Sequence, residues 1–272
     1  MSIGGRSATL QHLTTLTMTL DSPQLSKLTP LQVAAAGPYM QGVLMESIDS
    51  DYAQFLHELL FNPYSQYCYK DKETAKLIWH VSALTDEACA NIIDPLLKEK
   101  SFAIHGLKAK FDVLEKHVKT CTLKDLTDII QDSNQEKVHI RFITPTAFKS
   151  KGKYVFMPNL RLVFQNLFMH FTQVYEGDKE IDEETIAYLE QHVAISSYNL
   201  RSQYFVHAMN ENKKVPAFVG TIILSFKGPR TVAGLAHMLL QFGEYAGVGI
   251  KTSMGMGGMR CELRDKTAVS NK

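Results

Sequence analysis

The sequence predicts an α+β protein built from two tandem βαββαβ domains, on three observations. The chain has 272 residues, more than the ~100 to 150 residues of the commonest single domains. Strand-like and helix-like stretches follow one another in the same order in both halves. Residues 1–136 carry 12 Lys and Arg against 17 Asp and Glu, whereas residues 137–272 carry 17 against 11. We therefore expect an acidic domain at 8–131 and a basic domain at 137–266.

In the first half, an alternating apolar pattern is followed by a helical one. Leu16, Met18 and Leu20 alternate with polar residues, which predicts a half-buried strand. Pro38 suits the first turn of a helix, and Asp49 can cap a second helix that continues from the first. The predicted elements are strands over 10–20, 76–84 and 102–114, and helices over 37–48, 52–60 and 85–98.

The second half repeats this order. Residues 138–144 (VHIRFIT) alternate as a strand. A basic loop over 145–153 and a short strand over 154–157 follow, and Pro158 begins an apolar helix. An acidic helix over 181–193 reads as an insertion. The remaining predicted elements are strands over 194–209 and 216–226 joined by a hairpin loop at 210–215, a helix over 231–242, and a last strand over 256–263. Two such units in tandem are the ferredoxin-like (RRM-like) arrangement.

Composition excludes several classes of protein. The chain is 45% hydrophobic and 21% charged, which is typical of a soluble protein with a full core. Its apolar runs are shorter than the ~18 residues of a membrane span, so we expect a cytoplasmic protein with no membrane partner. The four cysteines lie too far apart for C-x-x-C metal pairs, and no two histidines have H-x-x-x-H spacing. We therefore expect no metal site and no cofactor.

The stretch GEYAGVGIKTSMGMGGMR, residues 243–260, holds six of the sixteen glycines. Such a cluster indicates left-handed turns or close approach of backbone to a ligand. A Walker loop needs G-x-x-x-x-G-K-[ST] between a strand and a helix, but here the order of elements is reversed. A dinucleotide fingerprint needs a third glycine where this chain has Thr252. A nucleotide cofactor is therefore not expected, and the ordinary alternative is a tight turn that packs a helix on a sheet.

The spacing of the glycines resembles a known signature. Gly247-Val248-Gly249, five residues that include Lys251, and then Gly255-Met256-Gly257 are similar to the glycine-rich motif of the RAMP superfamily of CRISPR-associated RNA-binding proteins. Within it, the sequence most resembles CRISPR-associated protein six, the repeat-cleaving endoribonuclease. This resemblance implies metal-independent cutting of CRISPR repeat RNA by 2′-OH attack, with 2′,3′-cyclic phosphate and 5′-OH products. It also implies a monomer or homodimer that associates transiently with a CRISPR effector complex.

His57 is the candidate catalytic residue. It lies in the run YAQFLHE, and NPYS follows a few residues later. This resembles the first-helix pattern of the family, which ends in a Leu-His pair followed by a Pro-aromatic-Ser/Thr turn. The family's histidine commonly transfers a proton, a task that an unperturbed pKa of ~6.5 suits. Taken alone, a histidine after an apolar helix face is more often structural.

The sequence departs from the family beside this histidine. Some relatives place a tyrosine upstream in the helix and a lysine shortly after the histidine, but this chain has Met45 at the tyrosine position and no lysine between His57 and Lys70. Three hydroxyl side chains lie nearby in the sequence: Tyr39, Ser47 and Tyr52. We assign Tyr39 to the catalytic site together with His57.

A basic segment follows the first strand of the second half. Residues 143–166 (ITPTAFKSKGKYVFMPNLRLVFQN) resemble the family's Thr-Pro-Thr turn, basic loop, strand and Pro-led helix. Its lysines lie beside Phe148 and Tyr154, which places phosphate-binding charge next to stacking faces. An ordinary solvated hairpin is the alternative. The residues expected to bind RNA are Lys149, Lys151, Lys153, Arg161, Lys227, Arg230, Gly247, Gly249, Lys251, Thr252, Ser253, Gly255 and Gly257; Arg260 borders the same loop.

Two other functions stay open on the sequence alone. A non-catalytic RAMP-type RNA-binding subunit of a CRISPR ribonucleoprotein would share the glycine-rich loop, and the departures at Met45 and after His57 favour it. A ferredoxin-like protein unrelated to RNA is the other. The basic second half argues against the latter, since it suits a polyanion.

Overall fold

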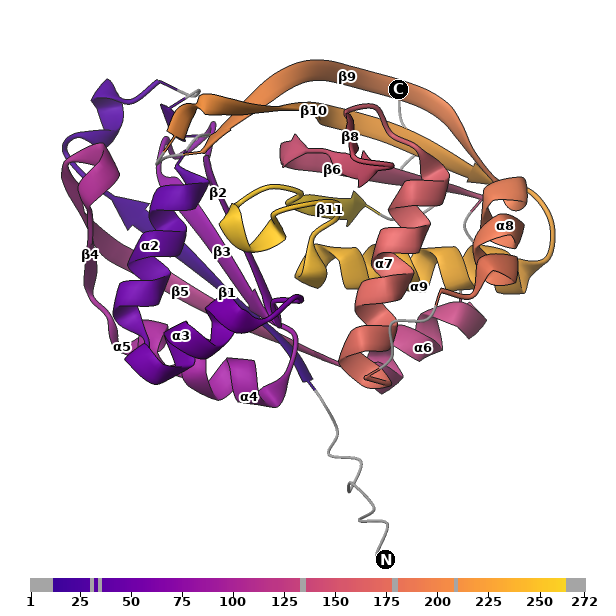
Figure 1. Cartoon of the computed structure of the whole chain (residues 1–272), viewed down its shortest axis with the longest axis horizontal. Coiled ribbons are helices and arrows are strands. Elements are labelled where there is room, and N and C mark those ends of the chain that lie inside the picture. The colour runs from indigo at the N-terminus through magenta and orange to yellow at the C-terminus, as the bar shows by residue number, and fades with distance from the viewer. Residues whose placement is uncertain are drawn as a thin grey trace, which may run out of the picture.

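Two antiparallel sheets, each covered by helices on one face, form the described part of the chain (Figure 1). The computed structural model describes residues 12–29, 32–33, 36–132, 136–177, 181–207 and 210–262. The α+β class and the two ferredoxin-like units are confirmed. The division at 8–131 and 137–266 stays a prediction, and its outer ends lie outside the described residues.

The N-terminal sheet has the strand order β2-β3-β1-β5-β4. Strand β5 takes the place of the fourth ferredoxin strand and β4 extends the sheet at its edge. On β1 the apolar residues Leu16, Met18 and Leu20 are buried beneath the helices, as the alternation predicts. The elements are β1 (His12–Asp21), η1 (Leu25–Lys27), α2 (Gly37–Ser47), α3 (Ser50–Glu58), β2 (Tyr64–Lys70), β3 (Leu77–Ala83), α4 (Asp86–Ala88), η2 (Cys89–Ile93), α5 (Asp94–Lys98), β4 (Ser101–Ile104), η3 (His105–Leu107) and β5 (Ala109–Thr122).

Strand β2 is missing from the elements that the sequence predicts. Its first five residues, YSQYC, are buried, including the polar Ser65 and Gln66. One face of β2 packs on the helices of its own domain, whereas Ser65 Oγ donates to Tyr245 O in the other domain. A strand with both faces covered shows no alternation of polar and apolar residues, so periodicity does not reveal it.

The C-terminal sheet has the order β11-β6-β10-β9, which is the ferredoxin order without additions. Residues 210–215, predicted as a hairpin loop, belong instead to β10. The predicted basic loop at 145–153 contains a small hairpin of its own. The elements are β6 (Lys137–Thr146), β7 (Phe148–Ser150), β8 (Lys153–Val155), α7 (Leu160–Tyr175), α8 (Glu183–His192), β9 (Val193–His207), β10 (Asn210–Phe226), α9 (Arg230–Ala246), η4 (Thr252–Met254) and β11 (Met259–Glu262).

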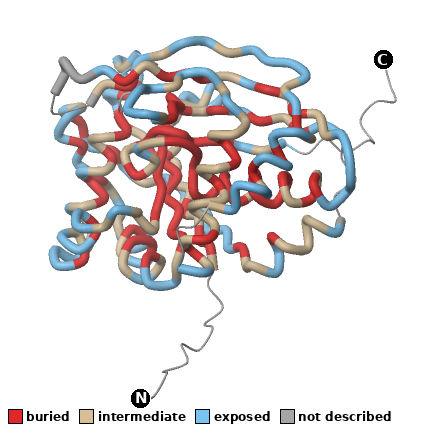
Figure 2. Tube along the Cα trace, turned by 45° about the vertical axis from the view of Figure 1, so that its right-hand side comes forward, coloured by how far each residue is buried: buried red, intermediate tan, exposed pale blue. Residues whose placement is uncertain are grey.

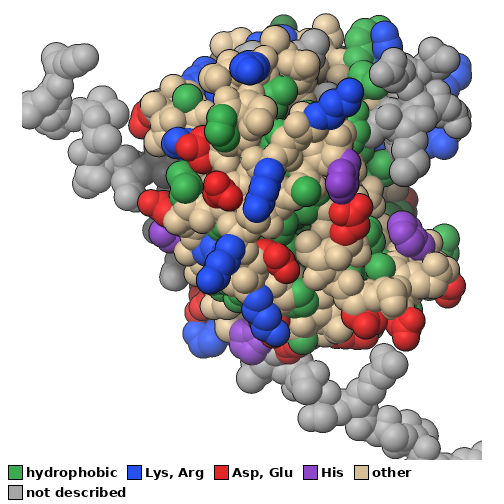
Figure 3. All heavy atoms as spheres, turned by 90° about the vertical axis from the view of Figure 1, so that its left-hand side faces the viewer, with side chains coloured by type: hydrophobic (Ala, Val, Ile, Leu, Met, Phe, Trp, Pro, Cys, Tyr) green, Lys and Arg blue, Asp and Glu red, His purple; other side chains and the backbone are tan. Residues whose placement is uncertain are grey.

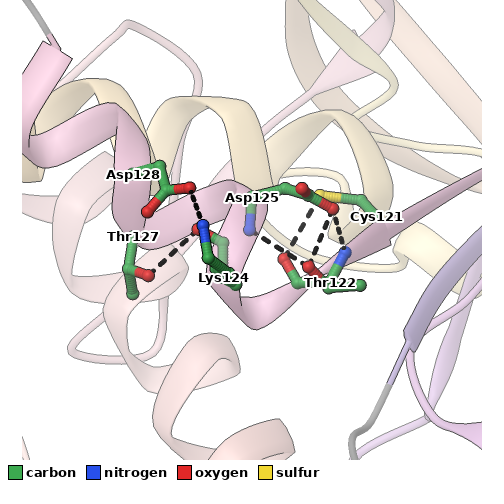
Figure 4. A network of polar contacts seen from close by, with 6 residues as sticks. All are labelled: Cys121, Thr122, Lys124, Asp125, Thr127 and Asp128. Carbon is green, nitrogen blue, oxygen red and sulfur yellow. Dashed lines mark hydrogen bonds and ion pairs between the residues drawn. The ribbon is translucent and has the colours of Figure 1, made fainter.

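Helix α6 (Leu123–Asp132) connects the two sheets, and its first turn is closed by side-chain hydrogen bonds (Figure 4). Thr122 N and Oγ1 each donate to Asp125 Oδ2 at 2.8 Å, and Asp125 N donates to Thr122 Oγ1 at 3.1 Å. These bonds lower the pKa of Asp125. Gly234 of α9 allows α6 to pack closely, because a Cβ there would lie 2.3 Å from Ile130 O. The two sheets are therefore connected by a capped helix that packs against α9.

Buried segments meet in the middle of the molecule, where the two domains join (Figure 2). Leu13, Leu84 and Cys121 come from the N-terminal half but belong to the C-terminal core. The two domains thus share apolar burial, which favours a fixed relative orientation. Within the described ranges, no helix is long and apolar enough to cross a lipid bilayer.

Candidate active site

The glycine-rich loop lies between the two domains, near the centre of Figure 1. It follows α9, contains η4 and leads into β11. On one side, a Cβ on Gly37 at the start of α2 would lie only 2.5 Å from Met254 O. On the other side, Ile250 N donates to Ala147 O at 3.0 Å. The loop therefore contacts both domains through its backbone.

Two glycine-to-alanine substitutions in α2 test this contact, because Gly37 lies at the contact and Gly42 does not. Gly42→Ala is expected to raise the free energy of unfolding by up to about 1 kcal/mol, because no atom lies within 4 Å of the added Cβ. Gly37→Ala is expected to lower it by about 1–3 kcal/mol, because the added Cβ meets Met254 and Gly255 backbone. Urea unfolding measures both. Equal stabilisation by the two substitutions would show that the loop yields freely at Gly37.

Most glycines of the loop serve the packing of the chain itself. Gly247, Gly249, Gly255 and Gly257 are buried and have φ angles of 70°, 90°, 95° and 70°. A Cβ would lie 2.3 Å from Ala147 O at Gly249 and 2.1 Å from Val248 O at Gly257. The expectation that these glycines present open backbone to a ligand is therefore corrected: they shape the base of the loop.

The tip of the loop is the part that faces solvent. Lys251 is exposed and adopts a left-handed conformation, with φ 59° and ψ 37°. Its carbonyl accepts from Met254 N at 3.0 Å and from Met256 N at 3.2 Å, which holds the turn. Thr252 is half-buried, and Ser253 is buried beneath it. The ammonium group of Lys251 is thus displayed from a turn with fixed backbone.

His57 is exposed in the last turn of α3. The helix begins at the N-cap Asp49, whose carboxylate accepts from Asp51 N and Tyr52 N. Just after His57, Asn62 Nδ2 donates to Ser253 Oγ at 3.4 Å. The structure therefore joins the segment that follows the histidine to the glycine-rich loop, 191 residues further along the chain.

The ring of Tyr39 lies against Gly106 in η3. A Cβ on Gly106 would come within 2.1 Å of that ring, so only glycine fits there. Tyr39 also packs at the edge of the N-terminal core. These contacts give Tyr39 a structural role, and its catalytic role stays a prediction.

The predicted basic loop is the hairpin β7–β8. Lys151 and Gly152 form its two-residue turn with φ angles of 48° and 77°, both in the left-handed region that such turns require. The side chains of Lys149 and Lys153 flank this turn and are exposed, as is Lys151. The hairpin begins directly after Ala147, which bonds to the glycine-rich loop. The structure therefore brings the two basic segments together.

One aromatic assignment in this hairpin is wrong. Phe148 is 3% exposed and belongs to the C-terminal core, so it presents no stacking face. Tyr154 is 42% exposed, and Phe156, which the sequence analysis did not single out, is 44% exposed. These two rings lie beside the lysines in the chain and are free to stack.

Arg161 is already paired. Its guanidinium donates to Glu183 Oε2 and lies 3.5 Å from Glu190 Oε2, both on α8. These carboxylates raise the pKa of Arg161. The acidic helix α8 thus neutralises a charge that the sequence assigns to RNA, and we place Arg161 in the α7–α8 contact.

Lys227 and Arg230 are exposed, but they lie at the wrong end of α9. The glycine-rich loop leaves the other end of this 17-residue helix, and a rise of 1.5 Å per residue separates the two ends by roughly 25 Å. These residues therefore lie far from Lys251, and their part in RNA binding stays a prediction.

A cluster that the sequence analysis missed joins the open faces of the two sheets. Arg260 of β11 bonds to His80 Nε2 at 3.0 Å and to Tyr69 OH at 3.4 Å. Burial and the neighbouring Arg260 lower the pKa of His80 to about 3, so the ring is neutral. Its Nε2 then accepts from arginine, and its Nδ1–H donates to Thr17 Oγ1 at 2.8 Å. Tyr67 stacks on His80 with ring centroids 4.7 Å apart.

Arg260 also lies directly opposite Arg141 across the β11–β6 pair. Like charges in that position destabilise a sheet unless an anion compensates them. Thr221 continues the same row on β10, and all three residues are exposed. No sequence spacing signals this row, because its members are brought together only by strand pairing. It is a second candidate surface for a phosphate backbone.

The outer face of the N-terminal domain differs from these surfaces. Figure 3 shows its Lys and Arg side chains interspersed with Asp and Glu. In the part of the chain that the structure describes, no group of three or more His, Cys, Asp and Glu side chains is placed to hold a metal ion.

The chain is similar in sequence to proteins of a described family. The family described as CRISPR-associated endoribonuclease Cas6 matches residues 140–259. The Cas6 of Streptococcus thermophilus is 38% identical over 225 residues, which cover 82% of this chain and 90% of that protein. The Cas6 of Mycobacterium tuberculosis is 38% identical over 258 residues, covering 93% and 79%.

Solved structures show the same fold. A Cas6 product complex superposes with a TM-score of 0.70 at 21% identity, covering 93% of this chain and 100% of that one. Thermus thermophilus Cas6 gives a TM-score of 0.66 at 20% identity over the same shares. With relatives this similar along most of its length, the chain belongs to the Cas6 family of CRISPR-associated endoribonucleases.

Proposed function

We propose that this protein binds CRISPR repeat RNA and cuts it through attack of a ribose 2′-OH on the adjacent phosphate. The observation that carries the proposal is the bond between Asn62 and Ser253, which joins the segment after the helix bearing His57 to the loop bearing Lys251. The segment that follows the exposed His57 is thus in contact with the loop that carries the exposed Lys251. Cas6 proteins of the same fold have been solved as product and substrate-mimic complexes.

The chemistry needs two proton transfers. The 2′-oxygen forms a bond to phosphorus and loses its proton, while the bond from phosphorus to the 5′-oxygen breaks and that oxygen gains a proton. The products are a 2′,3′-cyclic phosphate and a 5′-OH. We assign His57 to one of these transfers, and Lys251 to the phosphate charge. Because the nucleophile belongs to the substrate, we propose that no metal-bound water takes part.

The RNA is proposed to run along the C-terminal domain. Lys149, Lys151 and Lys153 offer phosphate contacts on the β7–β8 hairpin, and Tyr154 offers a stacking face. The Arg141–Arg260 pair offers a further contact on the open face of the sheet. Charge and exposure support this path, whereas the mixed outer face of the N-terminal domain does not attract a polyanion in the same way.

Removing the hairpin charges tests the path. The combined variant Lys149→Gln, Lys151→Gln and Lys153→Gln is expected to weaken repeat-RNA binding and to flatten its salt dependence. Each lost phosphate contact should reduce the slope of log K against log salt concentration by ~0.7 for single-stranded RNA. Filter binding at several salt concentrations measures the slope.

The matched control removes charges from the far end of α9. Lys227→Gln with Arg230→Gln is expected to leave both affinity and slope unchanged, because these residues lie roughly 25 Å from the glycine-rich loop along the helix. If the two combined variants flattened the slope equally, the hairpin would have no special part in binding.

A further inference from the structure

Two carboxamides, the buried Gln66 of the N-terminal domain and the half-buried Asn166 of the C-terminal domain, hold the base of the glycine-rich loop. Before the tip, Gly249 N donates to Asn166 Oδ1 of α7 at 2.7 Å. After the tip, Ser253 O accepts from Gln66 Nε2 of β2 at 3.1 Å. Lys251 lies between these two attachment points.

The carboxamide of Gln66 is fully used. It is 1% exposed, and its second Nε2 hydrogen goes to Gly37 O at 2.9 Å, while its Oε1 accepts from Trp79 Nε1 at 3.0 Å. Turning the amide over would face nitrogen with a donor and oxygen with two carbonyls. Such unpaired groups are costly in a buried site, so the orientation of Gln66 is fixed.

Asn166 is oriented from its other side. Its Nδ2 lies 3.4 Å from His170 Nε2, one helical turn further along α7. Burial lowers the pKa of His170 to about 4, so the neutral ring accepts this bond. The rings of Phe61 and His170 pack edge to face, with centroids 5.0 Å apart. The same helix that holds Gly249 therefore also touches the segment that follows His57.

The tip needs such support. A lysine in the left-handed region costs roughly 1 kcal/mol or more, and it persists only where its surroundings fix the backbone. The attachments at Gly249 and Ser253 fix the chain on both sides of Lys251. Neither residue belongs to the predicted set of RNA-binding residues, and Gln66 is buried.

We propose that Asn166 and Gln66 are positioning residues, which hold the tip of the glycine-rich loop so that Lys251 meets the RNA phosphate beside His57. This inference rests on the proposed function. The two amides would thus contribute to RNA affinity only indirectly, by positioning Lys251.

A double-mutant cycle tests the inference with labelled repeat RNA. Lys251→Gln is expected to weaken binding about two- to fivefold, the range for one exposed ionic contact. Asn166→Leu should weaken binding by a similar factor, because the loop loses its acceptor. In the Lys251→Gln background, Asn166→Leu should add almost nothing. Asn166→Asp keeps an acceptor for Gly249 N and should restore most of the affinity.

A second double-mutant cycle pairs Gln66→Met with Lys251→Gln and tests the attachment to the N-terminal domain in the same way. Thermal unfolding checks that each variant is folded. The inference would be overturned if the double variant lost affinity by the product of the two single-variant factors. It would also be overturned if either single variant kept the affinity of the unsubstituted protein. Those outcomes leave repeat-RNA cutting through His57 standing, although an unchanged affinity in Lys251→Gln would also remove Lys251 from phosphate binding. Failure of the unsubstituted protein to bind or cut repeat RNA would instead overturn the proposed function.

Discussion

Replacing His57 by alanine is expected to slow RNA cleavage by ~10²- to 10⁴-fold, the contribution of one proton-transfer group. RNA affinity should stay within a few-fold, because the proposed phosphate contacts come from lysines on other segments. The fold should be unaffected, since His57 is exposed in the last turn of α3. Single-turnover cleavage with enzyme in excess measures the chemical step, and equilibrium binding measures the affinity.

His105→Ala is the matched control. His105 is also exposed in the N-terminal domain, but it lies in η3 beside the β4–β5 edge of the sheet. It should cleave at the rate of the unsubstituted protein. Full activity in His57→Ala would remove this histidine from the mechanism, and an equal loss in both variants would point to an unspecific effect on the fold.

A repeat RNA with a single 2′-deoxy nucleotide at the cleavage position is expected to bind normally and to remain uncut. The proposed nucleophile is the 2′-OH of that nucleotide, so no substitute oxygen is available when it is absent. Removal of one hydroxyl leaves all phosphates in place, and affinity should therefore hardly change.

The control carries the 2′-deoxy sugar one nucleotide away and should be cut at the normal position and rate. Efficient cutting of the first substrate would mean that water attacks the phosphate. The products would then carry no cyclic phosphate, and the assignment of roles around His57 would have to be redrawn.

Much of the fold follows from the sequence because most strands have one covered face. The alternation of Leu16, Met18 and Leu20 marks β1, and the same period marks β6. It fails at β2, where the C-terminal domain covers Ser65, and where Gln66 bonds both to its own domain and to Ser253 of the other. From sequence alone, polar residues are predicted to be exposed unless their hydrogen-bond partners are known.

The residues of the candidate site could be predicted only where they belong to short sequence motifs. His57, the β7–β8 lysines and the glycine-rich loop are each contained in a few residues. The pairing of Arg161 with Glu183, 22 residues away, and the bond of Arg260 to His80, 180 residues away, depend on tertiary structure. Local sequence gives no sign of such partners, so the ion pairs of Arg161 were not predicted and His80 was missed.

The departures beside His57 also have a structural counterpart. Met45 packs at the edge of the N-terminal core, where the family's tyrosine would stand. Membership of the endoribonuclease family weighs against a purely RNA-binding subunit. His57 itself is exposed, and its proposed part in proton transfer does not depend on that tyrosine.

The most direct test is to incubate the purified protein with end-labelled CRISPR repeat RNA in excess EDTA and to identify the ends of the products. We expect one cut within the repeat, a 5′-OH on the downstream fragment and a 2′,3′-cyclic phosphate on the upstream fragment, at a rate that added Mg²⁺ does not raise. Cleavage that appears only when a divalent metal ion is supplied, or that leaves a 5′-phosphate, would contradict the account.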